Sequence, residues 1–415
     1  MQITKPGQRD VALSYFIYCL IGFFLVLSLY FNLGLINKEQ QFSHLANSFL
    51  QGKVYFVNDL PFWPSPSVYT DAVFFNGHYY WSEGPLPAII LMPFVLIFKL
   101  INLSFYQGYL QFFLIILIFW LCFKISKKIG HATIDSLFLA FAFCAASMFL
   151  GVALVSWAWY YSQVVAVSLI LLAILEYLGK KRYWLIGIIF GLLTVTRVTA
   201  SIGVIFFALE ILFSNRNIDK EKLRKLFQLV LPVVLIFILL LSYNYLRYNK
   251  FFEEGYGYMP LPADLNQARA YGLFSPIHIP GNLYYAFLVP PLPVFKDHVS
   301  HVLTFPFVKT NPWGMSIFIT SPWLIYLFFL KYRDKISAYL LITIVAIALP
   351  VFLFYGIGFN QFGYRYALDF FPFLFFLFNL NYWNQQKKLS TGIKTLIIIS
   401  SLFNLYLFLG FFSPY

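Results

Sequence analysis

The sequence predicts an all-α polytopic membrane protein with about eleven spanning helices and two long loops on its extracytoplasmic side. Hydrophobic residues fill 60% of the 415 positions and aromatic residues 22%, whereas only 11% are charged. A soluble protein of this length could not bury so much apolar surface, so lipid is the simpler solvent for it. The net charge of +13 does not indicate nucleic-acid binding, because the basic residues form short clusters between apolar runs.

The predicted helices follow from a series of apolar runs. The first extends from about Val11 to Phe31, which is long for the core of a signal peptide, and no small-residue cleavage site follows it. The others lie near 107–126, 134–155, 162–178, 183–198, 200–213, 226–246, 314–330, 336–355, 366–382 and 393–411. We therefore expect one transmembrane domain over residues 1–415, with long loops at 32–106 and 247–312.

A further apolar run, 86–103, decides the predicted orientation. If this run does not span the membrane, 19 of the 29 lysine and arginine residues lie in the cytoplasm together with the N-terminus. If the run spans the membrane, that distribution is reversed, so the positive-inside rule favours the first arrangement. Pro85, Pro87 and Pro93 also suit an interfacial or re-entrant helix better than a straight span. Both long loops are then extracytoplasmic, in a multi-pass protein of the inner or plasma membrane.

Acidic and histidine side chains gather on these two loops. Half of the 16 acidic residues and five of the six histidines fall there. They are Glu39, Asp59, Asp71, Glu83, Glu253, Glu254, Asp264, Asp297, His44, His78, His278, His298 and His301. Glu39 directly follows the first helix, where partial desolvation would raise the pKa of its carboxyl and improve it as a general base. Alternatively, Glu39 only marks the membrane interface. The distribution predicts chemistry on the extracytoplasmic face.

The segment from Asp71 to Ala88 combines aromatic rings with carboxylates. Asn76-Gly77 predicts a tight hairpin turn between two short aromatic strands. The segment contains Asp71, His78, Tyr79, Tyr80, Trp81 and Glu83. Aromatic faces stack on the C–H faces of sugars, and carboxylates accept hydrogen bonds from hydroxyls, which makes this segment a candidate sugar-binding site. The alternative is an interfacial aromatic belt.

Two arginines lie at the outer ends of apolar runs. Arg197 ends the run 183–198, and Arg365 precedes the run 366–382. A cation at this depth is a functional hypothesis by default, and a lipid-linked phosphate would satisfy both its charge and its donors. The alternatives are an i,i+4 ion pair between Arg365 and Asp369 and snorkelling of Arg197 to headgroups.

The sequence gives little indication of a cofactor. His298 and His301 beside Asp297 could hold a metal, but a spacing of three without a third distant ligand is a weak signal. No Gly-rich phosphate loop, nucleophile elbow or cysteine-based metal motif occurs in the sequence. We predict no cofactor and no metal site; a divalent metal is compatible with the sequence but has no support in it.

The chain resembles the GT-C glycosyltransferases, which include protein O-mannosyltransferase-like enzymes and the aminoarabinose transferases of lipid A. The resemblance rests on a long loop after the first helix, a second after the seventh, and basic residues at outer helix ends. Local stretches also carry it, namely 45–55, 71–88, 243–248, 254–257 and 363–366. It implies a GT-C-like bundle that transfers a sugar, with inversion, from a polyprenyl-phosphate donor to an extracytoplasmic glycan, lipid or protein.

The resemblance also implies roles for individual residues. Members place an acid, usually the Asp of an Asp-Glu pair, just after the first helix as catalytic base. The corresponding pair here is Lys38-Glu39, so the base would be Glu39 or Asp71. Arg197 corresponds to the basic residue of the family that contacts the donor phosphate, and Arg365 would share that role. The residues expected to bind the substrates are His44, His78, Tyr80, Trp81, Glu83 and Tyr366.

Three other functions fit parts of the same pattern. A lipid-linked glycan polymerase or ligase also needs outer-face arginines, but its donor is a diphosphate-linked oligosaccharide. A transporter or flippase typically shows inverted repeats and helices interrupted at the midplane, and the sequence contains no repeat. An inactive membrane scaffold would explain why Lys replaces the Asp of the expected acidic pair.

Overall fold

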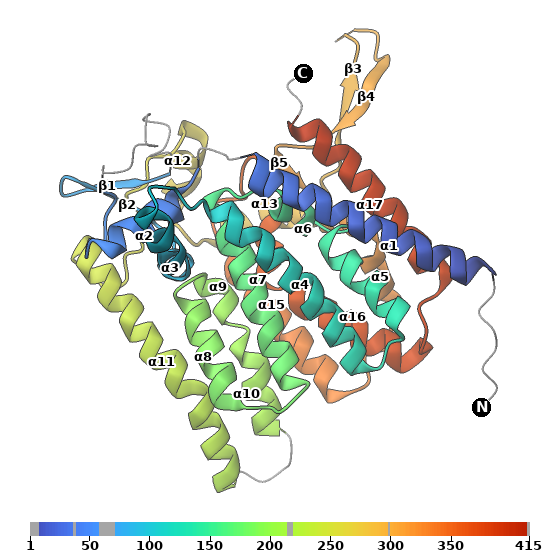
Figure 1. Cartoon of the computed structure of the whole chain (residues 1–415), viewed down its shortest axis with the longest axis horizontal. Coiled ribbons are helices and arrows are strands. Elements are labelled where there is room, and N and C mark those ends of the chain that lie inside the picture. Colours follow the sequence, from blue (N-terminus) through green and yellow to red (C-terminus); the bar gives the residue numbers. More distant parts are fainter. Residues whose placement is uncertain (1–7, 36–38, 58–70, 214–218, 298, 413–415) are drawn as a thin grey trace.

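A computed structural model gives the fold and describes residues 8–35, 39–57, 71–213, 219–297 and 299–412. Most of these residues are helical, and the helices pack side by side in one bundle (Figure 1). In that view the links from α4 to α5 and from α16 to α17 lie toward the bottom. Hairpin β1–β2 and helices α12 and α13 lie toward the top. The two long predicted loops therefore contribute to the same end of the bundle; which end faces the cytoplasm stays a prediction.

Six helices in the described ranges are long and apolar enough to cross a membrane, as expected for an integral membrane protein. They are α1 (Gln8–Leu29) continued by the π-helical turn η1 (Tyr30–Gly34), α4 (Gln107–Ile129), α7 (Ala158–Tyr177), α11 (Lys220–Tyr248), α15 (Lys335–Leu353) and α17 (Thr391–Phe412). The mostly helical membrane fold is confirmed, but the predicted count of about eleven spanning helices is not.

Several apolar runs that were predicted as single spans form shorter pieces. These pieces are α5 (Thr133–Cys144), α6 (Phe149–Leu154), α8 (Tyr183–Thr194), α9 (Val198–Ser201), α10 (Val204–Phe213), α14 (Ile317–Thr320), η4 (Pro322–Phe329), η5 (Arg365–Asp369) and α16 (Phe371–Gln386). In the first of these runs the helix stops at Cys144 and restarts at Phe149, although neither Gly nor Pro lies between them.

Side chains from distant helices satisfy the backbone at this break. Trp323 Nε1 donates to the Ala146 carbonyl at 2.9 Å, and Asn404 Nδ2 lies 3.4 Å from the Ala145 carbonyl. A non-helical segment is tolerated inside a membrane protein only where such partners replace the lost helical hydrogen bonds. The chain can therefore be interrupted here without exposing polar backbone to lipid.

Helix α4 carries a buried glutamine that ties it to the segment after α6. Gln111 Nε2 donates to the Val155 carbonyl at 2.9 Å and lies 3.0 Å from Asn32 Oδ1 in η1. Asn32 in turn donates from Nδ2 to the Ala153 carbonyl at 2.9 Å. Buried amides of this kind join helices that apolar packing alone would leave free to slide.

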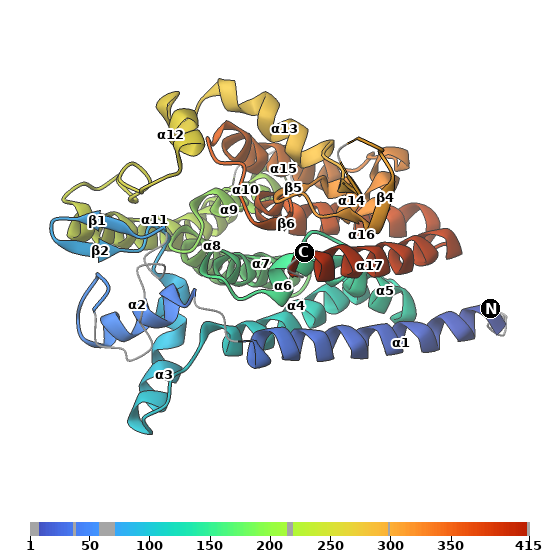
Figure 2. The same cartoon turned by 90° about the horizontal axis from the view of Figure 1, so that it is seen from above.

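The first long loop forms a hairpin and two helices. Strands β1 (Val73–Phe75) and β2 (His78–Tyr80) pair antiparallel, with Phe75 opposite His78. Asn76 and Gly77, at φ 49° and φ 81°, form the two-residue turn, so the predicted hairpin is confirmed. Helix α2 (Gln41–Leu50) packs against α3 (Leu86–Leu100) at the edge of the bundle (Figure 2).

Helix α3 covers most of the run whose placement decides the orientation. Its 15 residues extend about 22 Å, short of the roughly 30 Å of a hydrocarbon core. Pro93 lies inside it. Both properties agree with an interfacial or re-entrant helix, a placement that stays a prediction.

The second long loop contains short helices and a projecting hairpin. Its elements are α12 (Ala263–Ala270), η3 (Pro276–His278), α13 (Ile279–Phe287), β3 (Leu292–Phe295) and β4 (Leu303–Lys309). After it, β5 (Trp313–Met315) pairs in parallel with β6 (Gln361–Gly363). This pairing fixes the chain immediately before Arg365 against the end of the second loop.

Candidate active site

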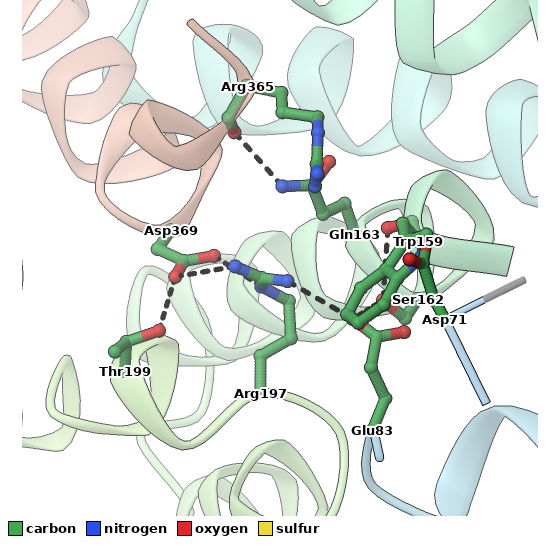
Figure 3. A network of polar contacts seen from close by, with 9 residues as sticks. All are labelled: Asp71, Glu83, Trp159, Ser162, Gln163, Arg197, Thr199, Arg365 and Asp369. Carbon is green, nitrogen blue, oxygen red and sulfur yellow. Dashed lines mark hydrogen bonds and ion pairs between the residues drawn. The ribbon is translucent and has the colours of Figure 1, made fainter. Parts of the chain in front are cut away.

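Arg197 lies at a break between two helices. Helix α8 ends at Thr194 and α9 begins at Val198, so Arg197 itself has extended backbone angles, φ −147° and ψ 105°. Its side chain reaches between Asp369 and Glu83 (Figure 3). Nε donates to Asp369 Oδ1 at 2.7 Å, Nη2 donates to Asp369 Oδ2 at 3.2 Å, and Nη1 lies 3.5 Å from Glu83 Oε1. The carboxylate of Asp369 thus already binds this half-buried cation, and Glu83 lies beside it.

Asp369 pairs with Arg197 and not with Arg365, contrary to one alternative for the sequence. Arg365 and Asp369 are the two ends of η5, which is a 3₁₀ helix. With three residues per turn, positions i and i+4 point about 120° apart, whereas in an α-helix they share a face. The carboxylate of Asp369 is instead fixed by Arg197 and by the hydroxyl of Thr199.

Arg365 is buried, with 6% of its surface exposed, but several of its N–H donors lack acceptors in the described structure. Its guanidinium carbon lies 4.6 Å from the Tyr366 ring centre and 5.5 Å from that of Tyr160. Within the described ranges, its Nε and Nη1 have no hydrogen-bond partner. A buried guanidinium with unused N–H groups is costly alone and is stabilised by an anion that brings oxygen acceptors.

Two carboxyl groups, Asp71 and Glu39, lie within electrostatic range of each other, and Asp71 is also within range of Arg365. Asp71 Oδ2 accepts a hydrogen bond from Trp159 Nε1 at 3.0 Å. Burial raises the pKa of Asp71, while the Trp159 hydrogen bond and the charge of Arg365 oppose that rise. Burial, with a further contribution from the negative charge of Asp71, raises the pKa of Glu39 to about 7. Asp71 therefore lies near both Glu39 and Arg365.

Gln107, at the start of α4, holds the backbone at Glu39. Its Nε2 donates to the Glu39 carbonyl at 2.9 Å and to the Ser156 carbonyl at 2.6 Å. Its Oε1 accepts from Phe42 N at 3.2 Å, and its own backbone N–H donates to Gln40 Oε1 at 2.9 Å. A single buried side chain thus joins the segment after α1, the start of α2 and the start of α7.

Glu83 faces Arg197 from the first long loop. Its Oε1 accepts a hydrogen bond from Ser162 Oγ at 3.0 Å. Burial raises the pKa of Glu83 to about 8, and the charge of Arg197 opposes that rise. The next residue, Gly84, lies so close to the α8–α9 break that an added Cβ would stand 2.2 Å from the Val195 carbonyl oxygen. Gly84 is therefore required to bring Glu83 against Arg197.

Two of the other predicted substrate-binding residues, Tyr366 and Trp81, lie beside the charged groups. The Tyr366 ring lies between the arginines, with its centre 4.6 Å from the guanidinium carbon of Arg365 and 6.0 Å from that of Arg197. Trp81 is fully buried and packs on Trp159, the partner of Asp71, with ring centres 5.0 Å apart. Both residues therefore adjoin the charged groups.

His78, Tyr80 and His44 contact other parts of the chain. His78 is exposed and stacks on Tyr55 at 3.9 Å, and Tyr80 is buried against Tyr248 at 5.4 Å. His44 is buried in α2, where burial lowers its pKa to about 3. These three side chains belong to α2 and β2 of the first long loop.

Sequence reasoning missed the contribution of helix α7. Trp159, Ser162 and Gln163 bind Asp71, Glu83 and the backbone of Arg365 from its first turns (Figure 3). Polar residues at the start of an otherwise apolar run were the available signal. Gln107 and Gln111, four positions apart in another apolar run, gave the same kind of signal.

Within the described residues, no group of three or more His, Cys, Asp or Glu side chains is arranged to hold a metal ion. Three residues that entered the sequence hypotheses, Lys38, Asp59 and His298, lie outside the described ranges.

No protein-family model matches the chain, and no curated protein matches it by sequence. Two solved structures from Archaeoglobus fulgidus are similar to it. The oligosaccharyltransferase in its apo form is 14% identical, with a TM-score of 0.49. The archaeal oligosaccharyltransferase AglB, in complex with an inhibitory peptide and a dolichol-phosphate, is 15% identical, with a TM-score of 0.45. Each comparison covers 95% of this chain and 55% of the other, so the chain spans about half the length of these proteins.

Proposed function

We propose that the chain is a membrane glycosyltransferase that moves a sugar from a polyprenyl-phosphate donor to an extracytoplasmic acceptor. The observation that carries the proposal is the buried guanidinium of Arg365. Its Nε and Nη1 lack partners in the described part of the chain, and its charge acts on Asp71. A phosphate group supplies both the negative charge and the oxygen acceptors that such a guanidinium needs.

Asp71, which lies near Arg365, and Glu39, which lies near Asp71, both suit a general base. An acceptor hydroxyl gives its proton to Glu39, or to Asp71, and its oxygen forms a bond to the anomeric carbon. The bond from that carbon to the phosphate oxygen breaks on the opposite face, and the electron pair leaves with the polyprenyl phosphate. A carboxyl whose pKa is about 7 is well matched to accept a proton at neutral pH. Glu39 is therefore our first choice and Asp71 the second.

The two arginines have unequal shares in this proposal. Arg365 brings unused N–H groups and would carry most of the charge that develops on the departing phosphate. Arg197 would also contact the donor phosphate but would stabilise less of its charge, because Asp369 already binds Nε and Nη2 of Arg197. Tyr366, between the two arginines, Trp81 and Glu83 would orient the sugar. His44, His78 and Tyr80 would contact the acceptor from the first long loop.

We also propose that, among known enzymes, the chain is related to the protein O-mannosyltransferases and the aminoarabinose transferases. We also propose that the loops 32–106 and 247–312 are extracytoplasmic and that the acceptor is a glycan, a lipid or a protein. A diphosphate-linked oligosaccharide that served as donor in place of a monophosphate-linked sugar would favour the polymerase or ligase alternative.

The test is a transfer assay with the full chain in liposomes. Labelled undecaprenyl-phosphate sugars are supplied with membrane extract as the source of acceptors, and release of undecaprenyl phosphate is measured. We expect release by the wild type and its loss in Arg365→Gln and in Glu39→Gln or Asp71→Asn. Lys250→Gln, which changes an exposed lysine that binds Tyr258, is the matched control. Full activity in both carboxylate variants would refute the mechanism.

A further inference from the structure

A pocket lies at the edge of the bundle, and neither Arg197 nor Arg365 is among the residues that line it. It opens between α2, α3 and the link to α4, and its volume is about 60 Å³. Figure 2 shows α2 and α3 side by side at this edge. The space admits a compact group of a few atoms and not a whole glycan.

Buried polar side chains from α2 line one wall of the pocket. Asn47 is fully buried and Ser43 is 7% exposed. Within the described ranges, Asn47 Nδ2 and Ser43 Oγ have no hydrogen-bond partner. Buried donors without acceptors cost free energy, so this wall is suited to a ligand that brings acceptor oxygens.

Lys99 adds a positive charge to the pocket from α3. It belongs to the otherwise apolar helix α3 and is the only formally charged residue among the described residues that line the pocket. Its Nζ donates to Asn47 Oδ1 at 3.0 Å, which leaves further N–H groups of the ammonium for a ligand. An ammonium, an amide N–H and a hydroxyl together favour an anion with several oxygens, for which phosphate is the common choice.

The surroundings of the pocket indicate that this anion arrives on a lipid. Leu103 and Phe105 line the same pocket. Ile97, Leu100 and Leu103 are large apolar side chains exposed on the adjoining surface. Acyl or prenyl chains could lie on that surface while the headgroup enters the polar pocket.

We propose that this pocket binds the phosphate headgroup of an anionic membrane lipid through Lys99, Asn47 and Ser43. Such binding would anchor α2 and α3 at the membrane surface. His44, which we assign to the acceptor, also lines this pocket, but Lys99, Asn47 and Ser43 have no part in the proposed chemistry. The inference therefore does not depend on transferase activity.

The experiment counts bound lipids on the intact full chain by native mass spectrometry. Phosphatidylglycerol, undecaprenyl phosphate, zwitterionic phosphatidylcholine and inorganic phosphate are titrated separately. We expect one site that takes phosphatidylglycerol or undecaprenyl phosphate well below the concentrations at which phosphatidylcholine or inorganic phosphate binds. Lys99→Gln should weaken that site about tenfold, the value of one charge-assisted hydrogen bond. Ser43→Ala should weaken it less, and Lys99→Arg should keep it.

Lys250→Gln is again the control, since it removes an exposed lysine elsewhere and should leave lipid binding unchanged. The proposal is overturned if Lys99→Gln binds phosphatidylglycerol as the wild type does, or if phosphatidylcholine binds equally well. Equal binding of inorganic phosphate would overturn the lipid part. A chain that bound lipid in this way but failed the transfer assay would contradict only the proposed enzyme activity.

Discussion

Arg197 and Asp369 are 172 positions apart in the chain, yet two hydrogen bonds join them, at 2.7 Å and 3.2 Å. The exposed fractions of their side chains are 11% and 1%. We expect Arg197→Gln to lower the free energy of unfolding by about 3–5 kcal/mol, because it leaves the Asp369 carboxylate buried without its cation. Thermal and denaturant unfolding of the purified protein in detergent would measure the loss.

The double variant Arg197→Gln/Asp369→Asn is the control for that prediction. Since it removes the carboxylate that lost its partner, it should recover part of the lost stability. A cycle in which the two losses simply add would show that the ion pair contributes nothing.

Arg365→Gln should lower the rate of transfer while leaving stability nearly unchanged. Because Nε and Nη1 of Arg365 make no hydrogen bond in the described structure, we expect the free energy of unfolding to change by less than about 1 kcal/mol. Transfer should fall by about 10²–10³-fold, the usual cost of removing one group that stabilises transition-state charge. Unfolding curves and initial rates on the same preparation would check both. A strongly destabilised but active variant would contradict the assignment of the phosphate to Arg365.

The rate of transfer should rise with pH through about 7. The pKa of Glu39 is raised to that value by burial and by the negative charge of Asp71, and a general base acts only after it has lost its proton. Asp71→Asn removes the negative charge and should therefore move the rising limb of kcat/KM to lower pH. Profiles of both proteins between pH 5 and 9 would show the shift. An inactive Asp71→Asn that folds normally would instead make Asp71 the base.

Gly84→Ala should weaken both stability and transfer. The new Cβ would lie 2.2 Å from the Val195 carbonyl oxygen, so the loop must move and carry Glu83 away from Arg197. Overpacking of this kind costs about 1–3 kcal/mol. Gly281→Ala is the matched control, because nothing lies within 4 Å of its added Cβ. Equal unfolding temperatures for the two variants would contradict the close approach.

Local features of the fold could be predicted where neighbours in sequence decide them. Asn76 and Gly77 adopt positive φ readily, so the hairpin turn was evident from two residues. The break between Cys144 and Phe149 was not, because Trp323 and Asn404 stabilise it from far along the chain. Apolar periodicity cannot distinguish one spanning helix from two short helices whose exposed backbone is satisfied elsewhere.

The sequence indicated which residues belong to the candidate site but not which of them form ion pairs with one another. Glu39, Asp71, Arg197 and Arg365 attracted attention as charges beside apolar runs. The structure couples Glu39 to Asp71, Asp71 to Arg365, and both arginines to Glu83. That Asp369 would bind Arg197 depended on the 3₁₀ geometry of η5. Their individual roles in catalysis stay predictions.

The two glutamines of α4 have a mechanical consequence. Gln107 and Gln111 bind the carbonyls of Ser156 and Val155, and Gln107 also binds that of Glu39. A one-turn slide of α4 would move each amide by about 5 Å and break every one of these bonds. The position of Glu39 along the bundle is thus fixed by hydrogen bonds to α4 and not by the surrounding lipid. In a thicker or thinner bilayer we expect the whole bundle to tilt. The position of Glu39 relative to α4 would then stay constant.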